Sequence, residues 1–369
     1  MKIMTVLGTR PEIIRLSLVI KKLDEYGNHV LVHTGQNHVE VLNEIFFKDL
    51  SLRKPDHFLD VRGDTFGEQL GHIVTKAEKV LLKERPDRLV VLGDTNSGLV
   101  AIVAKRMGIP VFHLEAGNRC YDDRVPEEIN RRVIDHSSSV LLPYTHRSKE
   151  NLIREGIERS RIYVIGNPIY EVLETYAGAI RGTDVHARLH LEENKYFLVT
   201  IHRAENVDHK ERLESLLSAL EVLARKYGLP VVCSLHPRTK SKMKAFGFAD
   251  SGGPVSFIEP LGFTDFVALE KSALCVLTDS GTVQEECCIL RVPNVTVRDV
   301  TERPETIETG SNVLTGMAAE RIVLCVDVAL REDRQWDRPA EYMDRHVSAK
   351  VVKILMGYER LEEPESRSS

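Results

Sequence analysis

The sequence has few of the features that mark membrane, secreted or nucleic-acid-binding proteins. No uncharged apolar stretch reaches the ~20 residues that cross a bilayer, and the first apolar run, Ile3–Leu7, is too short for a signal peptide. The six cysteines form no C-x-x-C pair and three lie in apolar runs, so we expect reduced thiols, no membrane association and a cytoplasmic protein. The formal net charge of −5 argues against a nucleic acid as partner.

Motifs for common cofactors and metals are also absent. No G-x-G-x-x-G follows the first apolar run, and Gly93 and Gly98 have the glycine spacing of a P-loop but are followed by Leu99 in place of lysine. The sequence contains no H-E-x-x-H, C-x-x-C or D-x-D that would hold zinc or a nucleotide-bridged divalent ion. We therefore expect neither a cofactor nor a metal.

What the chain does contain is a regular alternation of short apolar runs and longer amphipathic stretches. Its 369 residues suffice for roughly two domains of ~100–200 residues each. This alternation predicts an α/β protein whose parallel strands form two sheets of five or six strands, with a boundary near Gly166-Asn167-Pro168. The expected strands are Ile3–Leu7, His29–His33, Arg88–Leu92, Pro110–Leu114, Val140–Leu142, Arg161–Ile165, Tyr196–Ile201, Pro230–Leu235, Val255–Ile258, Leu274–Thr278 and Asn294–Val297.

Acidic residues follow neighbouring strands in the first half, where open α/β sheets bind their ligands. Asp94, Glu115 and Glu127 stand at such positions, and carboxylates held in one cleft have pKa values pushed apart, which provides an acid and a base at neutral pH. The plainer alternative is that Asp94 caps a helix and Glu127 complements a helix dipole. Arg10, after the Gly8 turn, either offers its planar fork to phosphate or faces solvent.

The second half contains an anion-binding pattern. A hydrophobic strand leads into Ser280-Gly281 and a helix, so free backbone amides face a potential anion. Glu286, about a turn and a half into this helix, either accepts both hydroxyls of a ribose or belongs to a solvated acidic face. His202 and His236 each follow a strand, where many histidines only satisfy local hydrogen bonds.

Seven motifs together resemble the bacterial non-hydrolysing UDP-N-acetylglucosamine 2-epimerase family, in the family's order. They are GTRPE (8–12), GDTNS (93–97), EAG (115–117), PEEINRR (126–132), HRAEN (202–206), TDSGTVQEE (278–286) and TERPE (301–305). The resemblance implies two Rossmann-like domains facing across a cleft, as in B-type glycosyltransferases, with a C-terminal helix that crosses back to the first domain. It implies an N-terminal domain of residues 1–168 plus 347–369 that carries the acid and base, and a UDP-binding domain of residues 169–346.

The resemblance also implies a reaction that needs no cofactor. UDP is eliminated from a UDP-N-acetylhexosamine to leave a 2-acetamidoglycal, and UDP adds back with C2 inverted, in a homodimer that supplies precursors of cell-surface polysaccharides. The implied catalytic residues are Asp94, Glu115, Glu127 and His202. The implied contacts to the UDP-sugar come from Arg10, Arg15, Arg119, His236, Ser280, Gly281, Glu286 and Arg303.

Some positions depart from the commonest pattern of the family. Arg15 stands where typical members have lysine, and Asn118-Arg119 replaces Leu-Arg after EAG. These changes resemble a sub-branch that acts on modified sugars, the UDP-N-acetyl-L-fucosamine synthases and UDP-2,3-diacetamido uronic acid 2-epimerases, so the hexosamine stays open, with a slight preference for the fucosamine type. The alternatives are a hydrolysing epimerase, a B-type glycosyltransferase and a catalytically silent UDP-sugar sensor.

Overall fold

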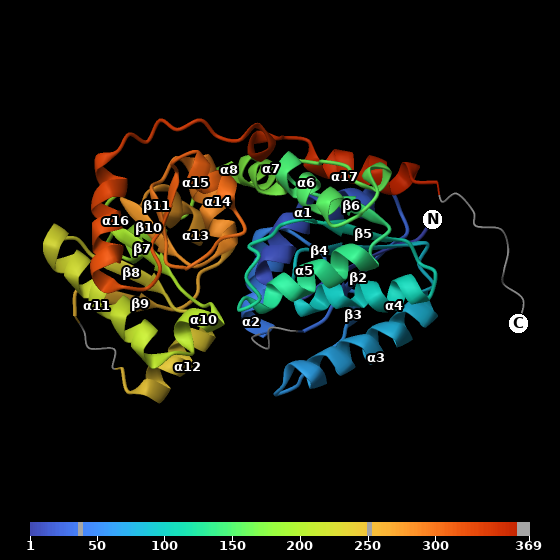
Figure 1. Ribbon diagram of the computed structural model, residues 1–369, viewed down its shortest axis with the longest axis horizontal. Coiled ribbons are helices and arrows are strands. Elements are labelled where there is room, and N and C mark those ends of the chain that lie inside the picture. The colour runs from blue at the N-terminus through green and yellow to red at the C-terminus, as the bar shows by residue number, and fades with distance from the viewer. Residues whose placement is uncertain (36–39, 249–252, 360–369) are drawn as a thin grey trace, which may run out of the picture.

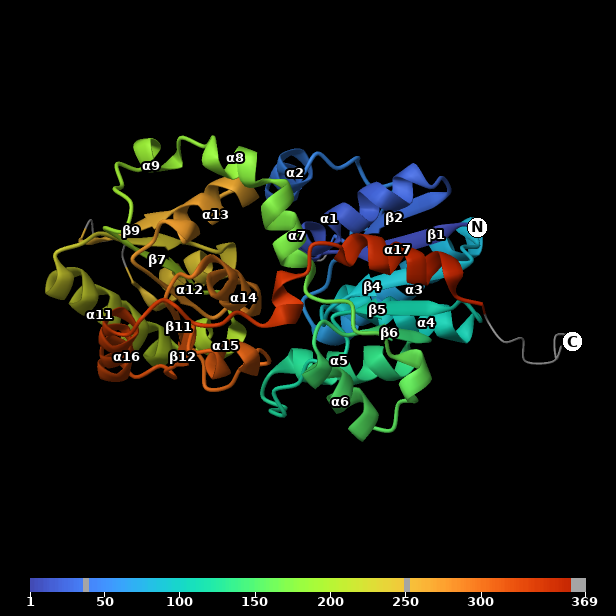
Figure 2. The same ribbon diagram turned by 90° about the horizontal axis from the view of Figure 1, so that it is seen from above.

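The computed structural model describes residues 1–35, 40–248 and 253–359, which form two α/β units. Each unit is built around a six-stranded sheet, in the order β3-β2-β1-β4-β5-β6 in the first and β12-β11-β10-β7-β8-β9 in the second. Helices lie on both faces of each sheet (Figures 1 and 2). The strand order is that of a doubly wound fold, so the expected α/β architecture of two Rossmann-like units is confirmed.

The strands are short, parallel and mostly buried, as expected where helices cover both faces of a sheet. The first sheet contains β1 (Ile3–Leu7), β2 (His29–His33), β3 (His57–Phe58), β4 (Arg88–Leu92), β5 (Val111–Leu114) and β6 (Val140–Leu142). The second contains β7 (Phe197–Thr200), β8 (Val231–Ser234), β9 (Val255–Ile258), β10 (Cys275–Thr278), β11 (Asn294–Thr296) and β12 (Asn312–Leu314).

Two differences from the predicted strands lie at the edges of the sheets. The strand expected at Arg161–Ile165 is wrong, because residues Arg159–Arg161 form a 3-10 turn and Ile162 makes one isolated bridge with Leu141. The edge strands β3 and β12 escaped prediction because two or three residues are too few to show an alternating pattern.

The helices connect successive strands. Those of the first unit are α1 (Arg10–Glu25), α2 (Glu40–Asp49), α3 (Phe66–Glu84), α4 (Val100–Arg106), α5 (Pro126–Ser137), α6 (His146–Arg154) and α7 (Pro168–Thr175). They are followed by α8 (Ala177–Arg181), α9 (Val185–Arg188), α10 (Ala204–Val207), α11 (Lys210–Tyr227), α12 (Pro237–Phe246), α13 (Phe263–Lys271), α14 (Gly281–Leu290), α15 (Pro304–Glu308), α16 (Ala319–Arg331) and α17 (Val347–Gly357). None of the described helices is long and apolar enough to span a membrane.

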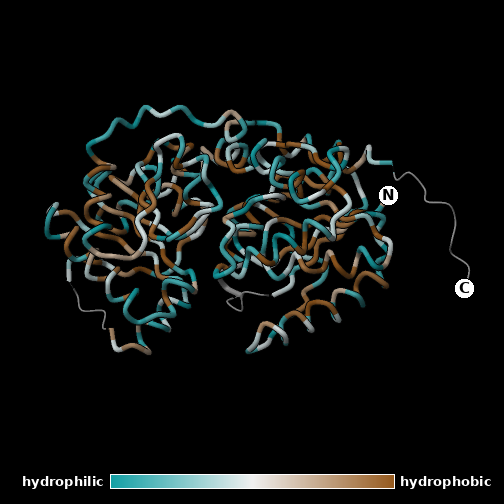
Figure 3. Tube along the Cα trace, viewed as in Figure 1, coloured by the Kyte–Doolittle hydropathy of each residue, from teal (hydrophilic) through white to brown (hydrophobic). Residues whose placement is uncertain are grey.

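An apolar core runs without a break from one unit into the other. It contains Leu7 of β1, Val172 of α7, Leu198 of β7 and Val276 of β10. Helix α7 makes the junction, because it packs against α1 on one side and α14 on the other. The hydropathy colouring follows the same plan, with apolar segments in the sheets and polar segments on the outside (Figure 3).

The C-terminal helix returns to the first unit. The chain leaves α16 on the second unit and crosses to α17, which packs against α1 and α7 (Figure 1). Val347, Val351 and Leu355 are fully buried there, and the Ser348 amide donates to Glu171 of α7 at 2.8 Å. The charged, Ser-rich composition of the tail Glu362–Ser369 predicts fraying, and this tail lies outside the described residues.

Candidate active site

Three acidic residues lie just beyond the carboxyl edge of the first sheet. Asp94 follows β4, Glu115 follows β5, and Glu127 is the second residue of α5. Glu115 has a left-handed backbone (φ 66°), which residues other than glycine seldom adopt. At Gly117 (φ 80°) a Cβ would lie 2.2 Å from the carbonyl oxygen of Ser148. This tight turn sets the direction in which Glu115 points.

Glu115 belongs to a closed ring of four charged side chains, two from each unit. Arg15 of α1 contacts Glu115 through Nη1 and Glu285 of α14 through Nη2. Arg303 closes the ring, with Nη2 2.5 Å from Glu115 Oε1 and Nε 2.5 Å from Glu285 Oε1. All four side chains are at most 7% exposed. The ring is neutral as a whole and ties the two units together.

The ring controls the ionisation of Glu115. Burial alone would raise its pKa, but Arg15 and Arg303 outweigh burial and lower the pKa of Glu115 to about 2. Asp94 behaves differently, because burial, together with the charges of Glu127 and Glu115, raises its pKa against the effect of Arg131. The pKa values of the two carboxyl groups therefore lie apart, as an acid and a base require.

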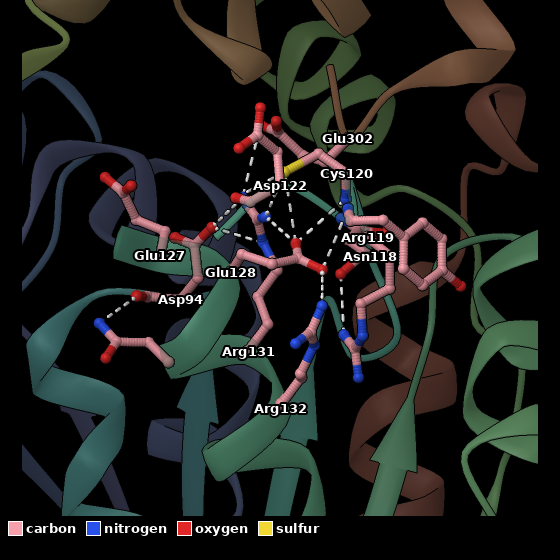
Figure 4. Close-up of polar contacts among 12 residues, drawn as sticks. Asp94, Asn118, Arg119, Cys120, Asp122, Glu127, Glu128, Arg131, Arg132 and Glu302 are labelled. Carbon is pink, nitrogen blue, oxygen red and sulfur yellow. Dashed lines mark hydrogen bonds and ion pairs between the residues drawn. The ribbon is translucent and has the colours of Figure 1, made fainter. Parts of the chain in front are cut away.

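Asp94 is held by an arginine of α5. Arg131 lies with Nε 2.9 Å and Nη2 2.6 Å from Asp94 Oδ2, and its Nη1 donates to Glu128 at 2.8 Å (Figure 4). Glu128 is fully buried and accepts from the backbone amides of Cys120 and Tyr121 at 3.0 and 3.2 Å. Asp94, α5 and the loop after β5 are thus held in one network.

Glu127 makes a second link between the units. Arg203, which precedes α10, lies with Nη1 3.2 Å from Glu127 and Nη2 3.5 Å from Glu302. Glu302 also pairs with Arg298 at 2.9 Å and lies 3.8 Å from Arg131. Burial opposes the ionisation of Glu302, but these arginines together lower its pKa well below the usual value. Glu302 is therefore an anion shared by arginines of both units.

The amino end of α14 lies beside these charged residues. A Cβ on Gly281 would lie 2.6 Å from Glu302 Oε1 and 3.6 Å from Cζ of Arg303. Ser280 precedes the helix as its N-cap residue, and its side chain makes no capping hydrogen bond. Because the first amides of a helix have no intrahelical partner, this end of α14 offers donors next to the arginine that contacts Glu115.

Two histidines meet at the ends of β7 and β8. The ring centroids of His202 and His236 are 5.4 Å apart. Buried Asp279 accepts from the backbone amides of His202 and Arg203 at 3.0 and 2.9 Å, and lies 3.3 Å from His202 Nδ1. Burial, aided by Arg203 and Arg10, lowers the pKa of His202 to about 3, and burial and His202 lower that of His236 to about 3. Both imidazoles are neutral at neutral pH.

Arg10 begins α1 at a turn that Glu12 organises. The buried carboxylate of Glu12 accepts from the Gly8 amide at 3.0 Å and from the hydroxyls of Thr9 and Thr95 at 2.7 and 3.1 Å. Burial raises the pKa of Glu12 to about 7, against the effect of these hydrogen bonds. Glu12 thus stabilises the turn that precedes Arg10, and the charge of Arg10 contributes to the lowered pKa of both histidines.

Two clefts border the loop between β5 and α5, and residues of both units line each of them. One, of about 530 Å³, lies between residues 118–121, α6 and residues 301–305. The other, of about 540 Å³, lies between residues 122–126, helices α10 and α11, and residues 298–300. Glu302 lines the first cleft and Arg298 the second, so both clefts reach the charged residues described above.

Arg119, expected to contact the sugar, is engaged by the protein itself. Its guanidinium is 0% exposed, and it donates to Asp135 at 2.7 Å, to Glu155 at 2.5 Å and to the Asn118 carbonyl at 2.8 Å. Arg119 thereby holds the loop in shape, and its contact with substrate stays a prediction. Glu286 on α14 is 3% exposed, so it does not belong to a solvated acidic face.

Several residues of this site were not singled out from the sequence. They are Arg131, Arg203, Glu285 and Glu302. Each lies within one of the seven motifs, and all but Arg131 are adjacent to a predicted residue. The signal was the arginine content of those motifs, since arginines next to acidic positions at strand ends suggest ion pairs. Within residues 1–35, 40–248 and 253–359, no group of three or more histidine, cysteine or acidic residues is arranged to hold a metal ion.

Known proteins share both the sequence and this architecture. The sequence model of the family described as UDP-N-acetylglucosamine 2-epimerase matches residues 21–356. The chain belongs to this family. Membership of the epimerase family confirms the resemblance carried by the seven motifs.

Individual members of the epimerase family match along nearly the whole chain. The UDP-N-acetylglucosamine 2-epimerase of Methanocaldococcus jannaschii is 44% identical over 363 residues, covering 96% of this chain and 99% of the relative. A crystal structure of that enzyme in complex with UDP-GlcNAc and UDP gives a TM-score of 0.93 at 43% identity, covering 97% and 100% of the two chains. The UDP-2,3-diacetamido-2,3-dideoxy-D-glucuronate 2-epimerase of Pseudomonas aeruginosa is 37% identical over 360 residues, covering 96% and 99%.

Proposed function

We propose that this chain is a UDP-N-acetylhexosamine 2-epimerase of the non-hydrolysing kind. A base removes the C2 proton while the C1–O bond breaks, and the bonding electrons leave with UDP to give a 2-acetamidoglycal. UDP then attacks C1, and a proton reaches C2 from the opposite face, which inverts that centre. The contact of Glu115 with Arg303, beside the amino end of α14, carries the proposal, because it joins the acidic edge of one unit to the anion-binding end of the other.

In this proposal Asp94 exchanges the proton at C2. Its pKa is raised by burial and by neighbouring carboxylates, so it gains and releases a proton more readily near neutral pH than Glu115 does. Glu115 and Glu127 act as fixed anions that hold Arg303 and Arg203 toward the departing phosphate. Each such charge contact is worth ~10²–10³ in rate when it acts on the transition state.

The remaining predicted residues hold UDP in this proposal. The free amides at Ser280 and Gly281, with Arg10, His202 and His236, bind the diphosphate, and Glu286 accepts the ribose hydroxyls. Arg15 acts through Glu115, which it holds ionised. Arg119 acts through the loop that it fixes.

Deuterium exchange tests the reaction and the role of Asp94 together. In D2O the enzyme should place deuterium at C2 of the recovered UDP-sugar, read by NMR. Asp94→Asn keeps the shape but cannot carry the proton, so incorporation should fall ~10²-fold or more. Its affinity for UDP should hardly change, whereas Arg10→Ala should weaken UDP binding and serves as the contrasting variant. Exchange at the normal rate in Asp94→Asn would show that Asp94 is not the proton carrier.

The same experiment separates the alternatives. Release of free N-acetylmannosamine and UDP would indicate a hydrolysing epimerase, and sugar transfer to an added acceptor would indicate a glycosyltransferase. Tight UDP binding without deuterium at C2, over a panel of UDP-hexosamines, would indicate a sensor. Any of these results would replace the proposed function.

We propose UDP-N-acetylglucosamine as the first substrate to test, since the 44% identical relative bears that name. The 37% identical relative, named for a diacetamido glucuronate, supports including 3-acetamido uronic and 6-deoxy sugars. The predicted homodimer, the cytoplasmic location and the division into residues 1–168 plus 347–369 and 169–346 are part of the same proposal. Sedimentation of the full chain with and without UDP checks the homodimer.

A further inference from the structure

Arg298 lies buried at the carboxyl edge of the second sheet, two residues after the end of β11. Its side chain is 1% exposed, and its Nη1 donates to Glu302 at 2.9 Å. Its Nε and Nη2 are also buried, and they have no hydrogen-bond partner among the described residues. Buried N–H groups without an acceptor are costly, so nearly all of them in native proteins are satisfied. These two groups therefore need an acceptor that the described part of the chain does not supply.

The other three arginines around Glu302 each have a second carboxylate. These second partners are Asp94 at 2.6 Å for Arg131, Glu127 at 3.2 Å for Arg203, and Glu115 at 2.5 Å for Arg303. Arg298 differs, because the carboxylate of Glu205 stays 3.9 Å from its Nε. The Glu205 oxygen concerned, Oε1, is itself buried and has no hydrogen-bond partner within the described ranges. Arg298 thus has one bound anion fewer than its neighbours.

Arg298 lines the cleft of about 540 Å³ between residues 122–126 of the first unit and helices α10 and α11 of the second. The amino end of α11 opens into the same cleft, since its N-cap residue His209 lines the cleft and makes no side-chain capping hydrogen bond. The first amides of a helix have no intrahelical partner. A helix amino end beside an arginine fork is an arrangement that suits a phosphate group.

The acidic residues that line this cleft leave room for an anion, because three of the four already pair with an arginine. These pairs are Asp122 with Arg124 at 2.6 Å, Asp208 with Arg238 at 2.5 Å, and Asp299 with Arg212 at 3.2 Å. The fourth, Glu205, is 24% exposed. The residues proposed to hold UDP do not line this cleft, so it is a separate place on the molecule.

We propose that this cleft binds the phosphate group of a phosphomonoester, which accepts from Nε and Nη2 of Arg298 and from the free amides of α11. The phosphate takes the position beside Arg298 that Glu205 approaches without reaching. The cleft volume lies within the ~300–1,000 Å³ of small-molecule sites, more than a bare phosphate fills, so the organic group of the ligand has room beside it.

Arsenate, which has the shape and charge of phosphate, locates the site by crystallography. Crystals of the full chain soaked in arsenate should show an anomalous peak between Arg298 and the amino end of α11. A peak only at the amino end of α14, or no peak, would overturn the proposal. The soak uses the unaltered chain and needs no turnover, so its result does not depend on the proposed function.

Calorimetry with inorganic phosphate, on protein saturated with UDP, measures the affinity in solution. Arg298→Lys keeps a cation for Glu302 but loses the fork, so Kd should rise about tenfold, since a hydrogen bond between charged groups is removed. Glu205→Gln removes the competing carboxylate and should lower Kd. The matched control is Arg225→Lys, the same substitution near the other end of α11, which should leave Kd unchanged.

The results of the titrations decide both parts of the proposal. An unchanged Kd in Arg298→Lys and in Glu205→Gln would show that phosphate binds elsewhere, and Glu205→Gln decides alone if the lysine variant does not fold. Glucose 6-phosphate should bind more tightly than inorganic phosphate, because its hydroxyls add contacts in the cleft. Binding no tighter than that of the free ion would overturn a phosphomonoester as the ligand.

Discussion

The ring of Arg15, Glu115, Glu285 and Arg303 predicts a large, non-additive effect of mutation. Glu285→Gln preserves shape but leaves two buried arginines with one anion between them, a net charge of +1 in a site at most 7% exposed. Removing one partner from a buried ion pair costs about 3–5 kcal/mol, so we expect a loss of that size. Arg15→Met should cost a similar amount. The double variant leaves the neutral pair of Glu115 and Arg303, and should lose at least about 2 kcal/mol less than the sum of the single losses.

Urea unfolding measures these losses. Trp336 is the only tryptophan in the chain and donates from Nε1 to the carbonyl of Cys288 in α14 at 3.0 Å, so its fluorescence reports on the helix that carries Glu285. Circular dichroism should show the same transition if unfolding is two-state. The control is the exposed pair of Arg225 and Glu221 on α11, whose coupling should stay below about 0.5 kcal/mol. Additive effects in the ring would refute its description as one electrostatic unit.

Three further predictions concern the turn at α1, the mouth of α14 and the histidines. The pKa of Glu12 is about 7 in the folded chain against an ordinary value of 4.5, so between these pH values the folded protein binds more protons than the unfolded chain, and its stability falls as the pH rises. In urea titrations, the free energy of unfolding relative to Glu12→Gln should drop by roughly 3 kcal/mol from pH 4.5 to 7 and then level off. Gly281→Ala should weaken UDP binding, because the new Cβ would clash with the carboxylate of Glu302, which the arginines hold in place. The control is Gly71→Ala, whose new Cβ has no atom within 4 Å; it should stabilise α3 by roughly 0.5–1 kcal/mol without changing the affinity for UDP. The pKa of His202 is about 3, and a bound diphosphate would raise it, so the affinity for UDP should fall as the pH rises through the raised pKa. Calorimetry in buffers of different ionisation enthalpy should detect proton uptake on binding. The absence of proton uptake would contradict a contact between His202 and the phosphate.

Much of the fold was predictable from the sequence, because buried parallel strands appear in it as uninterrupted apolar runs. Strands such as β1 and β4 match their runs residue for residue, and turns follow at once. The prediction at Arg161–Ile165 failed because an apolar run can also serve as a single bridge at a sheet edge. Whether a run pairs along its length depends on neighbours that are distant in the chain.

The candidate site likewise contains residues that the sequence predicted and residues that it did not. Asp94, Glu115 and Glu127 were predictable, since topology alone brings residues after adjacent parallel strands to one edge. Their partners Arg131 and Arg203 were not, because a helical or loop arginine normally faces solvent. Arg131 pairs with Asp94 through the packing of α5 within the first unit, and Arg203 reaches Glu127 only because the two units dock. Burial and the neighbouring arginines, which together set the pKa values, likewise follow from tertiary packing and leave no local trace in the sequence.

The return of α17 to the first unit means that the polypeptide bridges the two halves twice, once after α7 and again after α16. Two covalent tethers allow rotation about a line drawn through them, but they resist sliding and swivelling. Any opening that admits a nucleotide should therefore be a hinge rotation about that line. Cutting the chain before Val347 would leave one covalent connection and allow the two units to rotate about other axes as well.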